Sequence, residues 1–188
     1  NTTADNNTAI GYLAMNANTT GLQNVSVGAC SNHGSTTACY TVAIGEKTFL
    51  ATNTGNGNTT VGQSSMRCNT SGANNTNIGR NGLCANTSGS SNTAIGSDSL
   101  KSNTTASNNT AVGYCSLRAN TTGTGNNAFG VLSLDANTEG DYNVAIGDSS
   151  LGAQTTASLN TAVGSAAATN ITTGGNNTAI GAESLRAN

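Results

Sequence analysis

The residues whose side chains could act as catalysts are few, and they have no regular spacing. The one histidine, His33, lies between Cys30 and Cys39, and a Cys–His pair could supply a nucleophile and its base. No general acid accompanies this group. We therefore expect no catalytic residue, no cofactor site and no enzymatic activity.

The eight acidic residues are equally scattered along the chain. A repeated calcium site would place Asp at one fixed position of a repeat, and no position of this sequence does so. A local cation site is the alternative to a solvated acidic patch at Asp135, Glu139 and Asp141. The solvated patch is the favoured interpretation, so we expect no bound metal ion.

The five cysteines contain no Cys-x-x-Cys motif, which argues against a zinc site. Two pairs are candidates for disulfide bonds if their Cα atoms lie within about 7 Å of each other. Cys30 and Cys39 lie close in sequence, in a degenerate stretch that a covalent link would stabilise. The second pair is Cys68 and Cys84, and Cys115 is then left over.

Asn-x-Ser/Thr triplets, which can accept N-linked glycans, are frequent and recur in N-T-T segments. A chain rich in Asn and Thr forms such triplets by accident, and this is the simplest interpretation. The alternative is a row of glycans along an outer corner of the molecule. The candidate acceptors in that row are Asn18, Asn69, Asn86, Asn103 and Asn120.

These residues belong to a repeat whose unit is seventeen amino acids long. An Ile, Val or Phe followed by Gly recurs at this spacing from Ile10-Gly11 to Ile180-Gly181, without insertion or deletion. The consensus unit is N-T-A-I-G-x-x-S-L-x-x-N-T-T-G-x-N. Cys68 and Cys84 are separated by one residue less than this unit, so they should lie on neighbouring units. We expect residues 1–188 to form a single repeat domain of eleven units. Because both ends of the chain fall inside a repeat, it is expected to be a stretch of a longer fibre protein.

The composition of the unit favours strands over helices. Asn, Thr and Gly are poor in helix interiors, whereas T-A-I-G is a β-branched segment bounded by turn formers. Stacked coils would lie about 4.8 Å apart, so that eleven of them form a rod of roughly 50 Å. The predicted fold is therefore all-β, a parallel β-solenoid with 17-residue coils. A second short strand in each coil is expected near Leu100 or near residues 103–105.

Two apolar columns are the predicted core. One is the Ile, Val or Phe before each Gly, and the other is the Leu or its relative five residues later, with Asn32 and Ala168 as exceptions. The small residue before the Ile would point to the opposite side of the strand. The Gly is expected to supply a turn with positive φ.

An Asn column and two Thr columns complete the repeat. The Asn lies three residues before the Ile, where successive side-chain amides can form a structural ladder, with ligand contact as the alternative. One of the two adjacent Thr columns is expected to face solvent as a regular array of hydroxyl groups. The Asn column comprises Asn7, Asn24, Asn58, Asn75, Asn92, Asn109, Asn126, Asn143, Asn160 and Asn177.

Charge and hydropathy exclude other classes of protein. The net charge is −2, only 7% of the residues are charged, and no basic run occurs, which argues against a nucleic-acid partner. The apolar runs are only a few residues long, so no segment is expected to span a membrane.

The repeat resembles the head repeat of trimeric autotransporter adhesins, whose hallmark is S-V-A-I-G. The segments that carry the resemblance are Asn143-Val144-Ala145-Ile146-Gly147 and Thr41-Val42-Ala43-Ile44-Gly45. Similar N-T-A-I-G and N-T-T-G arrays occur in fibre proteins of aquatic bacteria and viruses. The resemblance implies a left-handed parallel β-roll, often trimeric, with a binding or spacer role outside the cell. It carries over no specific binding residue, and the 17-residue unit is longer than that of the family.

The resulting expectation is an extracellular or cell-surface structural or adhesive fibre segment, coated with glycans if the triplets are used. Its expected partners are copies of itself, as a trimer or filament, and cell-surface glycans. Two alternatives share the fold: the shaft of a viral or phage tail fibre, and an ice-binding solenoid that uses its Thr columns. The ice-binding alternative is weakened because no strict T-x-T strand recurs.

Overall fold

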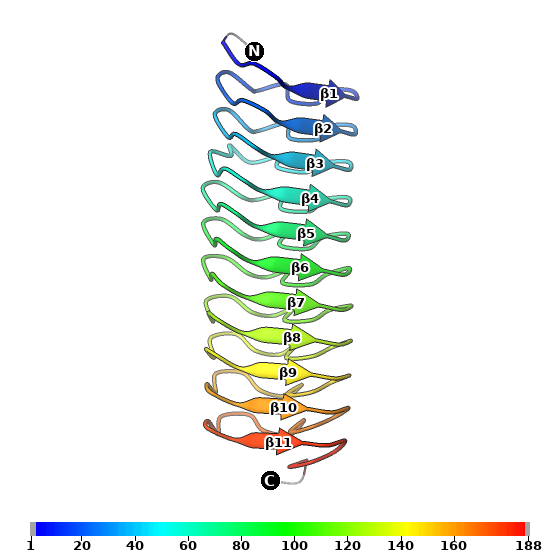
Figure 1. Ribbon diagram of the computed structural model, residues 1–188, viewed down its shortest axis with the longest axis vertical. Coiled ribbons are helices and arrows are strands. Elements are labelled where there is room, and N and C mark those ends of the chain that lie inside the picture. Colours follow the sequence, from blue (N-terminus) through cyan, green and yellow to red (C-terminus); the bar gives the residue numbers. More distant parts are fainter. Residues whose placement is uncertain (1–2, 187–188) are drawn as a thin grey trace.

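The computed structural model describes residues 3–186 as a rod of stacked coils (Figure 1). Each coil contributes one three-residue strand, and the 11 strands form a single parallel sheet in chain order. In Figure 1 the strands lie in front and run from left to right while the chain descends and returns behind them, so the coil is left-handed. The strands are β1 (Thr8–Ile10), β2 (Val25–Val27), β3 (Val42–Ile44), β4 (Thr59–Val61), β5 (Thr76–Ile78), β6 (Thr93–Ile95), β7 (Thr110–Val112), β8 (Asn127–Phe129), β9 (Val144–Ile146), β10 (Thr161–Val163) and β11 (Thr178–Ile180).

The register between neighbouring strands never shifts. Thr93 of β6 lies opposite Thr110 of β7, one full repeat later, and Ala94 lies opposite Ala111. The same pairing holds from β1 to β11, and residues 3–186 contain no helix. The prediction of an all-β, parallel β-solenoid is therefore confirmed. We number each coil by its strand, so that coil 6 begins with β6 and ends before β7.

The return arm of the coil is built from turns, and the prediction of a second strand in it is wrong. Residues near Leu100 form turns, and the N-T-T segment forms bends. Its backbone groups are nevertheless bonded from coil to coil. The amide of Leu100 donates to the carbonyl of Ser116 at 3.1 Å, and the amide of Thr104 donates to that of Thr121 at 3.1 Å. Hydrogen bonds therefore join successive coils on both sides of the rod, although only one side is a sheet.

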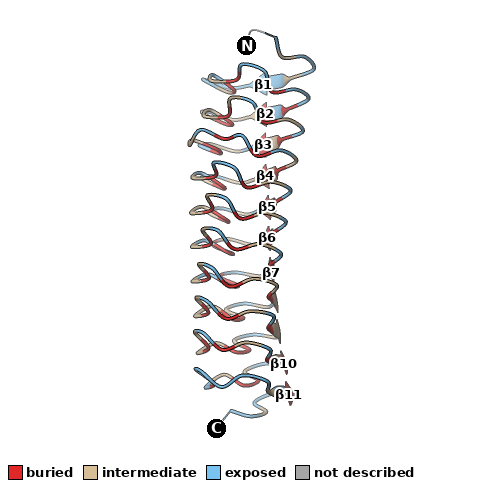
Figure 2. Ribbon diagram, turned by 90° about the vertical axis from the view of Figure 1, so that its left-hand side faces the viewer, coloured by how far each residue is buried: buried red, intermediate tan, exposed pale blue. Residues whose placement is uncertain are grey.

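The interior of the rod contains the Leu column but not the Ile column. Leu100 is fully buried and so is Ala94 of β6, whereas the neighbouring Ile95 is 37% exposed. Adjacent residues of a strand point to opposite faces, and here the Ala faces inward. The prediction that the Leu column is core is confirmed, and the prediction that the Ile column is core is wrong. Figure 2 shows buried segments of the chain, in red, recurring from coil to coil along the rod.

The narrow interior explains why Ala and not Ile faces inward. The opposite wall comes close to the strand: the hydroxyl of Ser116 donates to the carbonyl of Ala128 in the next strand at 3.1 Å. The same hydroxyl contacts that of Ser133 at 3.0 Å. A strand residue between these groups must be small, so the larger Ile is directed to the outside. The strand and the return arm are thus the two closely spaced walls of one flat coil.

Left-handed backbone conformations recur at fixed positions. The Gly after each strand has positive φ, as expected, and Gly45 has φ +133. A Cβ atom on Gly45 would lie 2.6 Å from the carbonyl oxygen of Gly62, so this position requires Gly for its space as well as its conformation. The residues three and five after the Ile also have positive φ, including Leu100 at 47°. Burial of the Leu side chain offsets the cost of a conformation that L-residues disfavour.

Coils 2 and 3 depart from the consensus. Asn32 occupies the Leu column and is buried, yet neither its side-chain nitrogen nor its oxygen has a hydrogen-bond partner. The buried Nδ2 of Asn53 also lacks a partner. Ser35 and Asn53 form an isolated bridge, and their separation in sequence is one residue longer than the repeat. Unpaired buried amides each cost roughly 1–3 kcal/mol, so this part of the described rod is its least favourable region.

Candidate functional site

The residues with potential for catalysis form no metal-holding group in the part of the chain that the structure describes. Within residues 3–186 no group of three His, Cys, Asp or Glu side chains could hold a metal ion. Cys39 uses its sulfur locally, because the amide of Leu22 donates to Sγ at 3.3 Å and the thiol donates to the carbonyl of Thr37 at 3.5 Å. No hydrogen bond joins His33 to Cys30 or Cys39 in the described part of the rod.

All five cysteines are free thiols, so neither predicted disulfide is present: Cys30 is not joined to Cys39, and Cys68 is not joined to Cys84. Cys68 and Cys84 do lie on neighbouring coils, where the amide of Cys68 donates to the carbonyl of Cys84 at 3.2 Å. Burial raises the pKa of the Cys84 thiol. A raised pKa lowers the thiolate fraction at neutral pH and makes this thiol a poor nucleophile.

The Asn column before each strand lies inside the rod as a ladder. The backbone amide of Asn92 donates to Oδ1 of Asn75 at 2.9 Å, and Nδ2 of Asn92 donates to the same atom at 3.1 Å. Nδ2 of Asn92 also donates to the carbonyl of Ala106 in the return arm at 2.9 Å. Each amide therefore joins two coils and the two arms of the solenoid. The side chain is consumed by these contacts and is not exposed to a ligand. The ladder members are Asn7, Asn24, Asn58, Asn75, Asn92, Asn109, Asn126, Asn143, Asn160 and Asn177.

The Asn of the N-T-T segment forms a second ladder that sequence reasoning missed. Nδ2 of Asn103 donates to Oδ1 of Asn86 at 2.9 Å and to the carbonyl of Ala106 at 3.0 Å. Its own Oδ1 accepts from Asn120 at 3.0 Å. The signal that could have found this ladder is the Gly or Ala three residues later, whose carbonyl accepts from the Asn. The second ladder comprises Asn18, Asn53, Asn69, Asn86, Asn103, Asn120 and Asn137, followed by Gln154.

The second ladder overturns the placement of the candidate glycan acceptors. Asn18, Asn69, Asn86, Asn103 and Asn120 were expected on an outer corner, but all are buried. A glycan replaces one hydrogen of Nδ2, and both hydrogens of Asn103 are used in the ladder. The folded rod therefore has no room for sugar at this position. Other Asn-x-Thr triplets begin at exposed residues on the opposite edge, namely Asn6, Asn74, Asn108 and Asn176.

The two Thr columns divide as expected. The hydroxyl of Thr104 donates to the backbone carbonyl of Thr121 in the next coil at 3.0 Å, and equivalent bonds recur along the rod. The following residue, Thr105, is exposed. One Thr column therefore contributes to coil stacking, and the other presents an array of hydroxyl groups to solvent.

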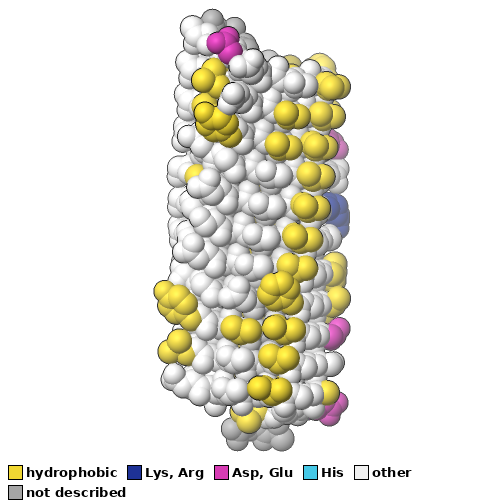
Figure 3. Space-filling view, viewed as in Figure 1, with side chains coloured by type: hydrophobic (Ala, Val, Ile, Leu, Met, Phe, Trp, Pro, Cys, Tyr) yellow, Lys and Arg dark blue, Asp and Glu magenta, His cyan; other side chains and the backbone are white. Residues whose placement is uncertain are grey.

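The outer face of the sheet carries a continuous apolar column. Figure 3 shows hydrophobic side chains running along much of the rod on the face that the strands occupy. We call the third residues of the strands the outer apolar column: Ile10, Val27, Ile44, Val61, Ile78, Ile95, Val112, Phe129, Ile146, Val163 and Ile180. A parallel column of Thr, Val and Asn, the first residue of each strand, lies beside it. Large exposed apolar surfaces of this kind mark sites of association.

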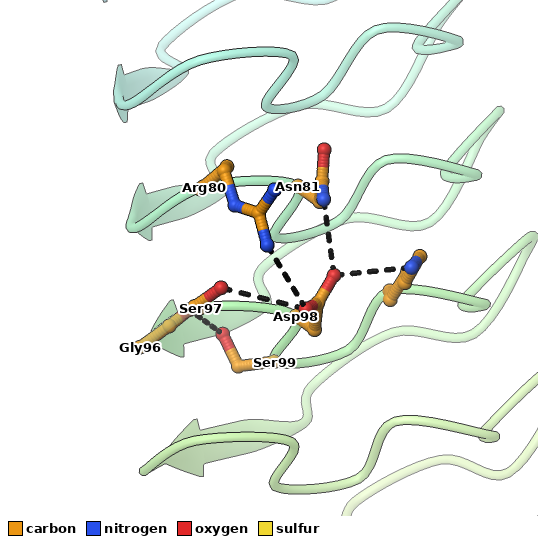
Figure 4. Close-up of polar contacts among 7 residues, drawn as sticks. Arg80, Asn81, Gly96, Ser97, Asp98 and Ser99 are labelled. Atoms are coloured by element: carbon orange, nitrogen blue, oxygen red, sulfur yellow. Dashed lines mark hydrogen bonds and ion pairs between the residues drawn. The ribbon is translucent and has the colours of Figure 1, made fainter.

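Most charged residues lie in the turns after the strands, on one edge of the coil. Asp98 is nearly buried there, with Lys101 at 3.1 Å and Arg80 at 4.0 Å, and it accepts a hydrogen bond from Asn81 at 3.1 Å (Figure 4). Burial of Asp98 opposes its ionisation, but these bonds and charges outweigh burial and lower its pKa. The pKa of Asp135 is raised because burial outweighs the charge of Arg118, 3.8 Å away.

No family model, curated protein or solved structure matches the chain. No helix of residues 3–186 is both long and apolar enough to cross a bilayer. The surfaces of the rod are therefore the basis for any functional conclusion.

Proposed function

We propose that this chain is a segment of an extracellular structural or adhesive fibre, and that its rods associate with copies of themselves through the outer apolar column. The observation that carries the proposal is the exposure of this column on a regular face: Ile78 is 46% exposed, Ile95 37% and Ile146 41%. Water contact with these side chains is unfavourable, and covering them would contribute about 25 cal/mol per Å² of apolar surface.

A second copy is the partner that fits this face best. The outer apolar column repeats with the coil spacing, about 4.8 Å along the rod. An identical rod has the same spacing, so that its side chains can interdigitate with those of the first over the whole length. Patches that contact themselves around a rotation axis are the usual basis of closed homo-oligomers.

The proposal is tested by the mass of the assembly in solution. The triple substitution Ile78→Thr, Ile95→Thr and Ile146→Thr keeps β-branched residues in the strands and is expected to leave the fold intact, which circular dichroism checks. Sedimentation equilibrium should show multiples of 18.5 kDa for the natural chain. The triple variant should associate at least about tenfold more weakly, or be monomeric.

The control removes apolar groups from another surface. Tyr40, Tyr142 and Leu159 are exposed, lie outside the sheet and have positive φ, which Asn tolerates. The variant Tyr40→Asn, Tyr142→Asn and Leu159→Asn should associate like the natural chain. A natural chain that is monomeric at all concentrations, or equal weakening in both variants, would refute the assignment of the association surface.

Ice binding is a second candidate, because the structure places a Thr column on the outer face of the sheet. Thr76, Thr93 and Thr110 begin β5, β6 and β7 and lie in register beside the outer apolar column. The outward-facing residues of these strands are thus Thr followed by Ile or Val, not the two Thr residues of a T-x-T motif. A measurement of thermal hysteresis on the natural chain distinguishes the candidates, since a fibre segment without ice affinity gives none.

A further inference from the structure

Five successive coils each place one basic side chain on the same edge of the rod. Coils 3, 4, 5, 6 and 7 contribute one residue apiece, and all five side chains are exposed. We call this row the cationic edge: Lys47, Arg67, Arg80, Lys101 and Arg118. It contains five of the six basic residues of the chain. The spacing along the row follows the coils, about 4.8 Å per step.

Contacts between coils show that these residues share one edge. Asp98 of coil 6 lies within ion-pair distance of Arg80 from coil 5 and of Lys101 from its own coil (Figure 4). The positions occupied by Arg80 and Lys101, two and six residues after the strand, are therefore neighbours. Arg67 and Arg118 occupy the same position in their coils as Lys101, and Lys47 occupies the position of Asp98. Figure 3 shows one patch of basic side chains at the margin of the rod, with acidic side chains above and below it on the same margin.

The cationic edge has an excess of positive charge in an acidic chain. Residues 44–128 contain its five basic residues and only two acidic ones, Glu46 and Asp98. This stretch therefore has a net charge of +3, or +2 when Asp135, the ion-pair partner of Arg118, is added, whereas the whole chain has a net charge of −2. Arg67 has no carboxylate within ion-pair range in the described part of the chain, and Lys47 and Arg118 each have one.

We propose that the cationic edge binds a linear anionic polysaccharide that lies parallel to the rod axis. The coil spacing is close to the length of one extended sugar unit, so the cations of successive coils can follow an extended chain of uronates along the rod. Lys and Arg form strong, charge-assisted hydrogen bonds with carboxylates. Because the backbone that carries the row is already ordered by hydrogen bonds between coils, binding has to order only the exposed side chains. This inference rests on the proposed function, since it names a partner for the adhesive surface of the fibre.

A polysaccharide fits the edge better than a single-stranded nucleic acid does. Nucleic-acid grooves combine cations with aromatic side chains on which successive bases stack. Within coils 3–7 the cationic edge has one exposed aromatic side chain, Tyr114, and no row of them. A row of charges without aromatic side chains can bind a polymer such as a polysaccharide, whose units have no aromatic ring to stack.

The test measures binding of a hexamer of β-1,4-linked mannuronate to residues 1–188 by titration calorimetry, with neutral cellohexaose as the reference ligand. The test variant is Lys47→Gln, Arg67→Gln and Arg118→Gln, which leaves the Asp98 network intact. The matched control is Asn74→Asp, Asn108→Asp and Asn176→Asp, which also lowers the net charge by three but on the opposite, exposed edge. Titrations are run at about 20 mM and about 500 mM NaCl, since screening separates charge-driven from apolar binding.

The proposal predicts that mannuronate binds at low salt, that high salt abolishes binding and that cellohexaose does not bind. The test variant should bind at least about tenfold more weakly, and the control should stay within about twofold of the natural chain. An equal loss of mannuronate affinity in both variants would show that binding depends on net charge alone, and would overturn the assignment of the site. Tighter binding of a single-stranded oligonucleotide than of mannuronate would overturn the polysaccharide. Failure here with intact self-association would refute this inference alone, because the association test uses a different face.

Discussion

The side chain of Asn77 fills the space next to Gly82 inside coil 5. A Cβ atom on Gly82 would overlap Oδ1 of Asn77. Asn77 occupies the inward strand position that is Ala in most coils, and Gly82 lies on the wall opposite. In the next coil the equivalent pair is Ala94 and Ser99. A larger residue on one wall is thus matched by a smaller one on the other, as close packing of the interior requires.

Restoring one member of this pair should destabilise coil 5, and restoring both should not. Gly82→Ser is expected to lower the free energy of unfolding by about 1–3 kcal/mol, because the interior becomes overpacked. The double variant Asn77→Ala and Gly82→Ser should be at least as stable as the natural chain, since it also removes the unpaired Oδ1 of Asn77. Urea denaturation of Gly82→Ser, of Asn77→Ala and of the double variant gives the coupling energy. Additive effects would show that the two side chains do not compete for space.

The second Asn ladder predicts a large difference between two nearby polar positions. Asn103→Ala removes two donated hydrogen bonds and leaves the buried Nδ2 of Asn120 without its acceptor in that ladder. The expected loss of unfolding free energy is about 2–4 kcal/mol. Thr105→Ala changes an exposed hydroxyl two residues away and should cost less than about 0.5 kcal/mol. Thermal unfolding of the two variants is the measurement, and similar losses would contradict the ladder.

Sugar acceptors should depend on whether the chain is folded. A soluble asparagine glucosyltransferase, which acts on Asn-x-Ser/Thr, should modify the exposed Asn74 and Asn108 of the folded rod. It should modify Asn86 and Asn103 only after unfolding in urea, because their amides are buried. Peptide mass spectrometry before and after unfolding reads out the sites. Modification of Asn103 in the folded rod would contradict its burial.

Two large apolar residues of coil 6 should respond differently to truncation. Leu100→Ala empties part of the interior and is expected to cost about 2–5 kcal/mol. Ile95→Ala lies on the outer face and should cost less than about 1 kcal/mol in the isolated rod, mainly through lower β propensity. Both values come from denaturation at a concentration where the rods do not associate. A larger loss of unfolding free energy for Ile95→Ala than for Leu100→Ala would contradict the placement of the Ile column on the outer face.

The hydrogen bonds and ion pairs of Asp98 should make the free energy of unfolding depend on pH in the acidic range. The pKa of Asp98 is lowered from its ordinary value of 3.8, so the folded state favours the carboxylate. Its contribution is present above pH 3.8 and is lost as the pH falls through the lowered pKa. Asp98→Asn should therefore lower stability at neutral pH, and its difference from the natural chain should shrink in acid. The exposed Asp148→Asn is the control in the same pH series, and a difference that does not change with pH would contradict the network.

The repeat made the fold predictable, but the faces of the strand were harder to assign. A three-residue strand has two possible orientations, and the greater apolarity of Ile95 over Ala94 favoured the wrong one. The deciding factor is the width of the interior, which depends on how the return arm approaches the strand. Leu100 was assigned correctly because it has no apolar competitor next to it. Asn103 was misplaced because its triplet has the same composition as an exposed turn, and only the position of the Ala106 carbonyl shows that it is buried.

The unshifted register from β1 to β11 also has a consequence for the gene. Every strand pairs with the strand one repeat away, so every coil offers its neighbours the same backbone pairing wherever it lies in the rod. Recombination that inserts or deletes a whole number of seventeen-codon segments would change the reach of the rod by about 4.8 Å per segment and disturb no other coil. Length can therefore vary between alleles in steps of one strand spacing, while the chemistry of each surface is inherited unchanged.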